Sequence, residues 1–478
     1  MTRPLSMYRP LAAIVGALLL AACKTFSPDG GMDAVVNLAG SELGKSVTAI
    51  RTPEDEAAAR DAVRRLLARS LSADDAVQIA LLNNRGLQAA YNELGLAEAA
   101  MVKESLPPNP TLSVERLSGP LEIEIEKRVI ANILALATLP ARADIAHDRF
   151  RQAQLRASEE TLRIAADTRR AYYRAVASRA RAVFFEQATS AAETAAKLTQ
   201  RLGESGAVNK LDQAREQVFY AEITAQLAGA RQQSLSERER LVRLLGLWGN
   251  DLSFKLPGAL PPLPSGAKAL HTVEVEAIRR RVDLQSARIE VETLAKSYGL
   301  TQATRFINLL EVSGVSKTKK ERETGERVRD RGFELEFQVP IFDFGEVRSR
   351  QASETYRQAT NRLVEKAVNV RSEARDAYLV YRSTYDIARH YRDEVLPLRK
   401  IISDETLLRY NAMQVDVFAL LTEARQRIAA NTTAIDAQRQ FWLASVELGA
   451  AVIGGGVSGG GGESAAMAAA AAEGAAGH

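Results

Sequence analysis

Residues 121–129 read LEIEIEKRV, a stretch in which aliphatic and charged side chains alternate. Because successive side chains of a β-strand point to opposite faces, the alternation predicts a strand with one apolar and one charged face. Residues 111–117 are a second candidate strand, and the Ser-Gly-Pro sequence at 118–120 predicts the turn between the two. The same alternation recurs as FELEFQV at residues 333–339, which Pro340 closes.

A fourth strand is predicted at residues 306–315, and the densely charged residues 316–331 that follow are expected to form a surface loop. Four strands are too few for a membrane barrel of one chain, because the smallest such barrels have about eight. An open sheet edge in lipid would also leave backbone amides unpaired. The strands therefore form either a soluble sheet or part of an oligomer, and three chains together would supply a closed twelve-stranded barrel.

Long helices flank these strands. Residues 141–201 contain neither Pro nor Gly and are rich in Ala, Arg, Glu and Leu, which predicts a helix roughly 90 Å long at 1.5 Å per residue. Gly203 and Gly206 end this helix, and Asn209 or Asp212 is expected to cap a return helix that reaches about Leu247. Two long helices joined by a short turn form an antiparallel hairpin.

The order of elements then repeats. A second long helix is predicted over residues 346–410, interrupted only by Pro397, and a turn near Met413 leads to a return helix that reaches about Leu448. A shift of 197 positions places Ala80 on Ala277, Leu87 on Leu284 and Leu112 on Leu309. The sequence therefore predicts an internal duplication of a mainly α-helical frame with a small β part.

These patterns divide the chain into a first repeat at residues 53–256, a Pro-rich linker at 257–271 and a second repeat at 272–453. Each repeat is expected to contain a helix, two strands and a long helical hairpin. Residues 454–478 are almost wholly Gly and Ala and predict a disordered tail.

The N-terminus predicts export. Residues 1–22 have a basic flank and a short apolar run, as a signal peptide has, and Leu-Ala-Ala-Cys at 20–23 resembles the lipobox of bacterial lipoproteins. Cys23 is the only cysteine of the chain. We therefore expect cleavage before Cys23, its acylation with chains such as palmitate, and a lipidated tether over residues 23–52. Lys24 favours sorting to the outer membrane.

The composition excludes several other classes of protein. The net charge of +4 is small for 478 residues and does not suggest nucleic-acid binding. The four histidines are scattered without metal-ligand spacing, and no nucleotide-binding, hydrolase or metalloprotease motif occurs. We therefore expect no catalysis, no cofactor and no metal site.

The chain resembles the TolC-type outer-membrane efflux family over nearly all of its mature length. The resemblance rests on Asn83-Asn84 after the helix that Ser72 caps, on the Pro-rich residues 106–110, on residues 333–345 (FELEFQVPIFDFG), and on Arg409-Tyr410 before Asp416. Residues 134–142 look like those of heavy-metal-efflux members. The family places Gly where Met413 stands, so we expect a tighter or differently closed turn there.

This resemblance implies a homotrimer in the cell outer membrane, in contact with its lipid, whose barrel is continuous with a periplasmic α-helical tunnel. Such a trimer docks on a periplasmic adaptor protein and an inner-membrane pump. In the family the hairpin tips close the tunnel and meet the adaptor. The corresponding residues here are Arg201, Gly203, Gly206, Asp212, Arg409, Tyr410, Met413 and Asp416.

Arg409, Tyr410 and Asp416 are candidates for latches of the closed state, although charges near helix ends are usually only solvated. The glutamates of the strands are expected to face the barrel lumen: Glu122, Glu124, Glu126, Glu334 and Glu336. They either favour cations or, as we consider more plausible, form a polar face without selectivity.

The predicted function is therefore passive conduction of small molecules or metal ions out of the cell. Two alternatives stay open. One is the outer-membrane duct of a type I protein secretion system, and the other is a non-channel structural lipoprotein that bridges the envelope.

Overall fold

The computed structural model describes residues 26–267 and 272–456. Cys23 with the predicted signal peptide and most of the predicted tail lie outside the described residues. The chain forms two compact units, which we call the strand unit and the hairpin unit. Of the described residues, the strand unit contains 26–34, Tyr91–Arg156 and Asp283–Lys366. The hairpin unit contains Val35–Ala90, 157–267, 272–282 and 367–456.

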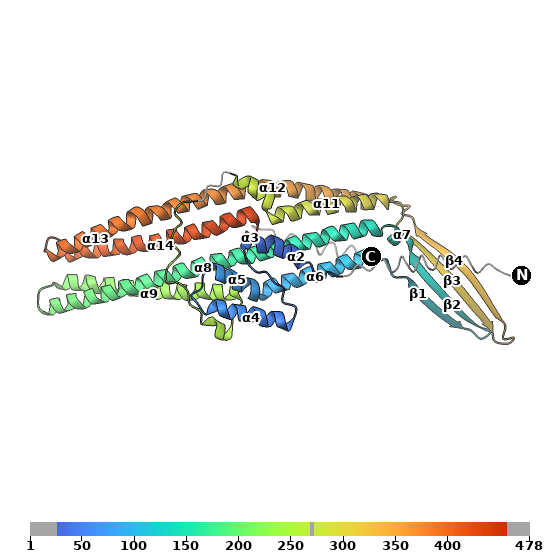
Figure 1. Ribbon diagram of the computed structural model, residues 1–478, viewed down its shortest axis with the longest axis horizontal. Helices are drawn as coiled ribbons and strands as arrows, with labels where there is room; N and C mark the ends of the chain where they lie inside the picture. The colour runs from blue at the N-terminus through green and yellow to red at the C-terminus, as the bar shows by residue number, and fades with distance from the viewer. Residues whose placement is uncertain (1–25, 268–271, 457–478) are drawn as a thin grey trace. The chain divides into compact units, whose positions relative to one another are not determined.

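The strand unit contains one antiparallel sheet in the order β1-β2-β3-β4 (Figure 1). Its strands are β1 (Thr111–Ser118), β2 (Glu122–Asn132), β3 (Leu309–Glu321) and β4 (Arg327–Gln338). The prediction of four strands is confirmed, and β2 pairs with β3 even though they come from different repeats.

The expected surface loop at residues 316–331 is wrong. Residues 316–321 continue β3, residues 327–331 belong to β4, and only the short segment between them turns. Lys317 lies opposite both Glu126 and Asp330, and Lys319 lies opposite Glu124. Charges of opposite sign on neighbouring strands stabilise pairing, so a high charge density does not require a loop.

Helices precede β1 and β3 and follow β2 and β4, so all of them join the sheet at the end opposite its two β-hairpin turns. They are α6 (Arg85–Ser105), α7 (Ile133–Ala137), α8 (Leu139–Glu204), α11 (Val282–Ala303) and α12 (Glu346–His390). Asn132 caps α7 by accepting a hydrogen bond from the Ala135 amide at 2.7 Å. Pro140 lies in the first turn of α8, where a missing N–H is tolerated.

The turn from β4 into α12 explains the sequence motif at residues 340–346. Phe344 and Gly345 both have left-handed backbones, with φ of 47° and 70°. A Cβ atom on Gly345 would lie 2.2 Å from the Arg305 carbonyl oxygen, so only glycine fits there. The Arg305 Nε group donates to the Phe344 carbonyl at 2.8 Å, which ties this turn to the residues after α11.

The hairpin unit holds both helical hairpins. The end of α8 and α9 (Lys210–Leu245) form the first, and α13 (Leu396–Asn411) and α14 (Val417–Ile453) form the tip of the second (Figure 1). Between α12 and α13 lies a π-helical turn, η3 (Tyr391–Val395). Pro397 follows this turn, so the predicted interruption is a single widened turn and the helix continues.

Shorter elements complete the fold. Residues 32–43, which we expected to lie in a tether, form α2 (Met32–Val35), a π-turn η1 (Val36–Gly40) and α3 (Ser41–Leu43). Val35 and Ala39 are fully buried, so part of this segment is packed structure. The remaining elements are α4 (Pro53–Leu67), α5 (Ala73–Asn83), η2 (Gly249–Leu252) and α10 (Val273–Arg280).

Asn83 and Asn84 close the end of α9. The Asn83 amide donates to the carbonyl oxygens of Leu245 and Gly246 at 3.0 and 2.7 Å, and the Asn84 amide donates to that of Leu244 at 2.9 Å. These carbonyls have no partner within the helix, so the two side chains satisfy them. Ser72 is the N-cap of α5, as predicted, and accepts from the Asp75 amide at 3.1 Å.

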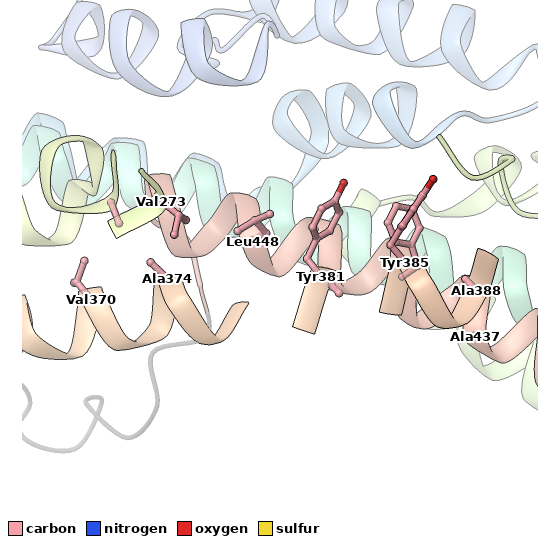
Figure 2. Close-up of a cluster of buried hydrophobic side chains, with 11 residues drawn as sticks. Val273, Val370, Ala374, Tyr381, Tyr385, Ala388, Ala437 and Leu448 are labelled. Carbon is pink, nitrogen blue, oxygen red and sulfur yellow. The ribbon is translucent and has the colours of Figure 1, made fainter. Parts of the chain in front are cut away.

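A buried cluster joins α10, α12 and α14, and Figure 2 shows its side chains. Tyr381 and Tyr385 lie 5.5 and 5.6 Å from the Phe441 ring, centroid to centroid. The Tyr385 hydroxyl donates to the Pro264 carbonyl at 3.1 Å, and Trp442 Nε1 donates to that of Pro261 at 3.1 Å. The Pro-rich linker is therefore fastened to the helices. No helix within the described residues is both long and apolar enough to cross a membrane.

Candidate functional site: the hairpin tips and a pocket with two glutamates

The first hairpin turns through Gly206, whose φ is 77°. The Gly206 amide donates to the Gly203 carbonyl at 3.0 Å and the Ala207 amide donates to the Leu202 carbonyl at 2.9 Å. This pair of bonds with a left-handed residue is a Schellman motif, which ends a helix by satisfying its last carbonyls. Asn209 then starts α9 by accepting from the Asp212 amide at 2.9 Å.

The second hairpin repeats each of these bonds 207 residues later. The Met413 amide donates to the Tyr410 carbonyl and the Gln414 amide donates to the Arg409 carbonyl, both at 2.9 Å. Asp416 starts α14 by accepting from the Ala419 amide at 2.8 Å. The two tips are therefore structural copies, which extends the duplication to single hydrogen bonds.

The turn at Met413 has the same form as the turn of the first tip. Met413 itself adopts the left-handed conformation, with φ of 57°, and takes the place that Gly206 has in the first tip. Its side chain is 95% exposed, so it meets no neighbour that would prevent this. The turn keeps its shape at the energetic cost of a non-glycine residue with positive φ.

The other predicted tip residues lie close to these turns. Gly203 faces Gln213, Arg201 is exposed, and Tyr410 is half-buried. Asp212 forms an ion pair with Arg215 at 3.2 Å. Arg409 and Asp416 are both exposed, and neither side chain forms an ion pair with any described residue of the chain.

Different residues join the two hairpins inside the chain. Arg425 of α14 forms an ion pair with Glu222 of α9 at 2.8 Å, and its guanidinium lies 5.6 Å from the centre of the Phe219 ring. Arg215 of α9 lies over the Phe418 ring at 5.3 Å. The sequence did not identify these residues, because the pairing of α9 with α14 cannot be deduced from either helix alone.

A pocket of about 370 Å³ lies between the hairpins behind the tips. Apolar residues of α8, α9 and α14 dominate its lining, among them Phe184, Ala192, Phe219, Leu421 and Ile428. Two carboxylates also line it, Glu216 and Glu423, and they are only 4% and 7% exposed. Buried carboxylates in an apolar pocket are costly and therefore mark a candidate site.

The two glutamates occupy equivalent positions. Each lies seven residues after the residue that caps its helix, Asn209 or Asp416, and so the two lie 207 residues apart. Each has one carboxylate oxygen that is buried without a hydrogen-bond partner among the described residues. Arg399 lies 3.4 Å from Glu423. The equal spacing of the two glutamates from their caps was visible in the sequence. Only the structure shows that both side chains are buried in one pocket, which identifies them as a candidate site.

Burial raises the pKa of Glu216 above its ordinary value. Arg427 also lines the pocket and donates to the Ser403 hydroxyl at 3.2 Å. The pocket thus combines apolar walls, an arginine and a carboxyl group whose pKa is raised by burial.

The strand glutamates share one face of the sheet, but this face is not purely acidic. Lys317 forms an ion pair with Glu124, and Arg128 lies 2.8 Å from Glu126 and 3.2 Å from Glu334. Glu122 lies 4.0 Å from Lys319, and Glu336 lies opposite Glu311. Basic side chains therefore neutralise most of this row. No cluster of three or more potential metal ligands occurs within residues 26–267 and 272–456.

Comparisons with known proteins agree with this architecture. Residues 274–403 match the family described as Outer membrane efflux protein. No curated protein matches the chain.

Several solved structures share the fold. CusC, described in connection with transmembrane channel formation, has a TM-score of 0.67 at 16% identity and covers 80% of this chain and 91% of its own. The CmeC outer membrane channel of Campylobacter jejuni has a TM-score of 0.68 at 16% identity over 83% and 88%. The outer-membrane channel OprN has a TM-score of 0.67 at 17% identity over 91% and 98%. Residues 274–403 are therefore similar to the family described as Outer membrane efflux protein, and the chain shares the fold of these outer-membrane channel structures.

Proposed function

We propose that this protein is the outer-membrane channel of a tripartite efflux system and passively conducts small molecules or metal ions out of the cell. Three copies form the channel, a periplasmic adaptor docks at the hairpin tips, and an inner-membrane pump supplies the energy. The protein itself performs no catalysis and needs no cofactor. Its likeness to outer membrane channels supports the efflux role.

One observation carries the proposal: a four-stranded sheet with two open edges and one apolar face. β1 and β4 each pair with only one neighbour among the described strands. On one face lie exposed apolar side chains, including Leu112 at 69% and Phe333 at 85%. In lipid the open edges cannot persist, so β4 of one chain would pair with β1 of the next until the barrel closes.

The lipid anchor is part of the proposal. Acylation at Cys23 would hold the N-terminus at the periplasmic surface of the outer membrane. The helical hairpins would then lie in the periplasm. The sequence of the lipobox and the single cysteine support this placement.

The test labels neighbouring residues of β1 in intact outer membranes. Ser113 lies on the face of Glu126 and Leu112 on the opposite face, and both are exposed in the single chain. With the Cys23 thiol acylated, Ser113→Cys should react with a water-soluble maleimide and Leu112→Cys should not, because lipid covers it. Equal labelling of both variants would mean a soluble sheet and would favour the envelope-bridging lipoprotein.

The same experiment separates conduction from scaffolding through a blocking reagent. A bulky maleimide attached at Ser113 would narrow the lumen and should reduce export by the intact system. Full export after complete labelling would contradict a lumen at this face.

A further inference from the structure

The apolar face of the sheet changes character toward its two hairpin turns. In three consecutive rows across the strands, six basic residues point to this face, and we call them the basic belt: Arg116, Lys127, Lys320, Arg327, Arg329 and Arg331. The first row consists of Val114, Lys127, Ser316 and Arg331, which pair across the four strands. The second row is Arg116, Ile125, Thr318 and Arg329, and the third is Ser118, Ile123, Lys320 and Arg327. Residues directly opposite one another share a face, so the assignment needs no further assumption.

The charge of the belt is not compensated on its own face. The other positions in these three rows are Val114, Ser118, Ile123, Ile125, Ser316 and Thr318, none of which is acidic. All six basic side chains are exposed, and none forms an ion pair with a described residue. The intervening rows face the other way and carry acidic residues such as Glu115, Glu126 and Asp330 together with Lys317 and Lys319, so the two faces differ in charge.

On the same face of the sheet, an apolar band lies between the belt and the helices. It includes Leu112, Val129, Val312, Phe333, Leu335 and Phe337, and most of these are exposed in the single chain. A strand face that is apolar along one part and basic along the next fits a membrane boundary. Basic side chains are costly in the hydrocarbon centre and tolerated near the interface, where their charge meets the headgroups.

We propose that the basic belt binds the phosphate groups of lipid headgroups in the outer leaflet. This inference rests on the proposed function. If the helices lie in the periplasm, the β-hairpin turns at the opposite end of the sheet lie at the outer end of the barrel. Four of the six residues are arginines, whose planar guanidinium binds phosphate oxygens in pairs. A ring of three chains would repeat the belt around the barrel and fix its depth in the membrane.

The experiment measures binding of lipid A to the detergent-extracted full-length protein. The probes are fluorescent bisphosphorylated lipid A and the same lipid with both phosphates removed, presented in non-ionic detergent. The belt variant is R327Q/R329Q/R331Q, which changes the three exposed arginines that β4 contributes to the belt. The control variant is R350Q/R362Q/R382Q, which changes three exposed arginines of α12 that form no ion pair with a described residue.

We expect the wild-type protein to prefer the phosphorylated lipid at least tenfold. Each cation near an anionic surface contributes roughly a fivefold change in affinity, so the belt variant should lose on the order of 100-fold while the control stays at the wild-type value. R327K/R329K/R331K retains the charge but not the paired hydrogen bonds, so its affinity should lie between that of the wild type and that of the belt variant.

Equal affinity for both lipids, or an unchanged belt variant, would overturn the inference. Competition by millimolar inorganic phosphate would also overturn it, because the belt would then bind a free anion and not a headgroup. The labelling at Leu112→Cys is measured in parallel. If Leu112→Cys is protected from the maleimide but the protein binds both lipids equally, only the belt is rejected. If Leu112→Cys is labelled freely, the channel itself is rejected.

Discussion

Met413 keeps a left-handed backbone in a turn where its structural counterpart is Gly206. Glycine adopts this conformation without steric cost, whereas a side chain with a Cβ does not. We expect Met413→Gly to raise the free energy of unfolding by up to about 1 kcal/mol, and Gly206→Met to lower it by a similar amount. Chemical denaturation of the purified protein measures both. Opposite signs would mean that the exposed Met413 side chain has contacts outside the chain.

Glu216 makes stability depend on pH. Because burial raises the pKa of its carboxyl above 4.5, the folded chain retains a proton that the unfolded chain has already lost. The contribution of this proton to the free energy of unfolding is fully present below the pKa of the unfolded chain. It is lost as the pH rises through the higher pKa of the folded chain. Glu216→Gln is neutral throughout and should therefore be more stable than the wild type at neutral pH, by about 1 kcal/mol.

The measurement for Glu216→Gln is thermal unfolding between pH 4 and pH 8, with Glu239→Gln as control. Glu239 lies on the same helix and is exposed. The advantage of Glu216→Gln should shrink as the pH falls toward 4, and the control should show no such trend. A constant difference across the range would show that packing and not ionisation causes the effect.

At the second hairpin tip, one residue has a capping role and a proposed role in gating. Asp416 is the N-cap of α14, so Asp416→Ala removes a cap as well as a charge. If Arg409 and Asp416 latch the closed tunnel, Asp416→Ala and Arg409→Ala should both raise the basal conductance in planar bilayers. Asp416→Asn keeps the capping oxygen and removes only the charge.

The Asp416→Asn variant separates the two roles. A rise in conductance equal to that of Asp416→Ala identifies the charge as the latch, and a wild-type value identifies the cap. Unchanged conductance in all three variants would reject a latch at these residues.

Sequence patterns predicted elements better than they predicted contacts. The alternation at residues 121–129 and the long Pro-free segment at 141–201 produced the correct strands and helices, because each pattern reports a local period. The charged residues 316–331 were misjudged, since their partner charges Glu124 and Glu126 lie nearly 200 positions away. Arg425 and Glu423 were missed for the same reason, because only the packing of α14 on α9 reveals their roles.

At the scale of the whole molecule, the account depends on how the open sheet is completed. A four-stranded sheet with unpaired edges and an apolar face is unsuited to a membrane as a single copy and suited to it as a ring. The proposed trimer would therefore connect the strand pattern, the proposed lumen and the basic belt.

The native mass of the detergent-extracted outer-membrane protein tests this most directly. The account predicts a trimer that stays in the membrane fraction when Cys23 is replaced by a residue that takes no lipid, with a non-lipoprotein signal peptide supplied. A monomer, or release of the unlipidated protein into the soluble fraction, would contradict the barrel and with it the channel.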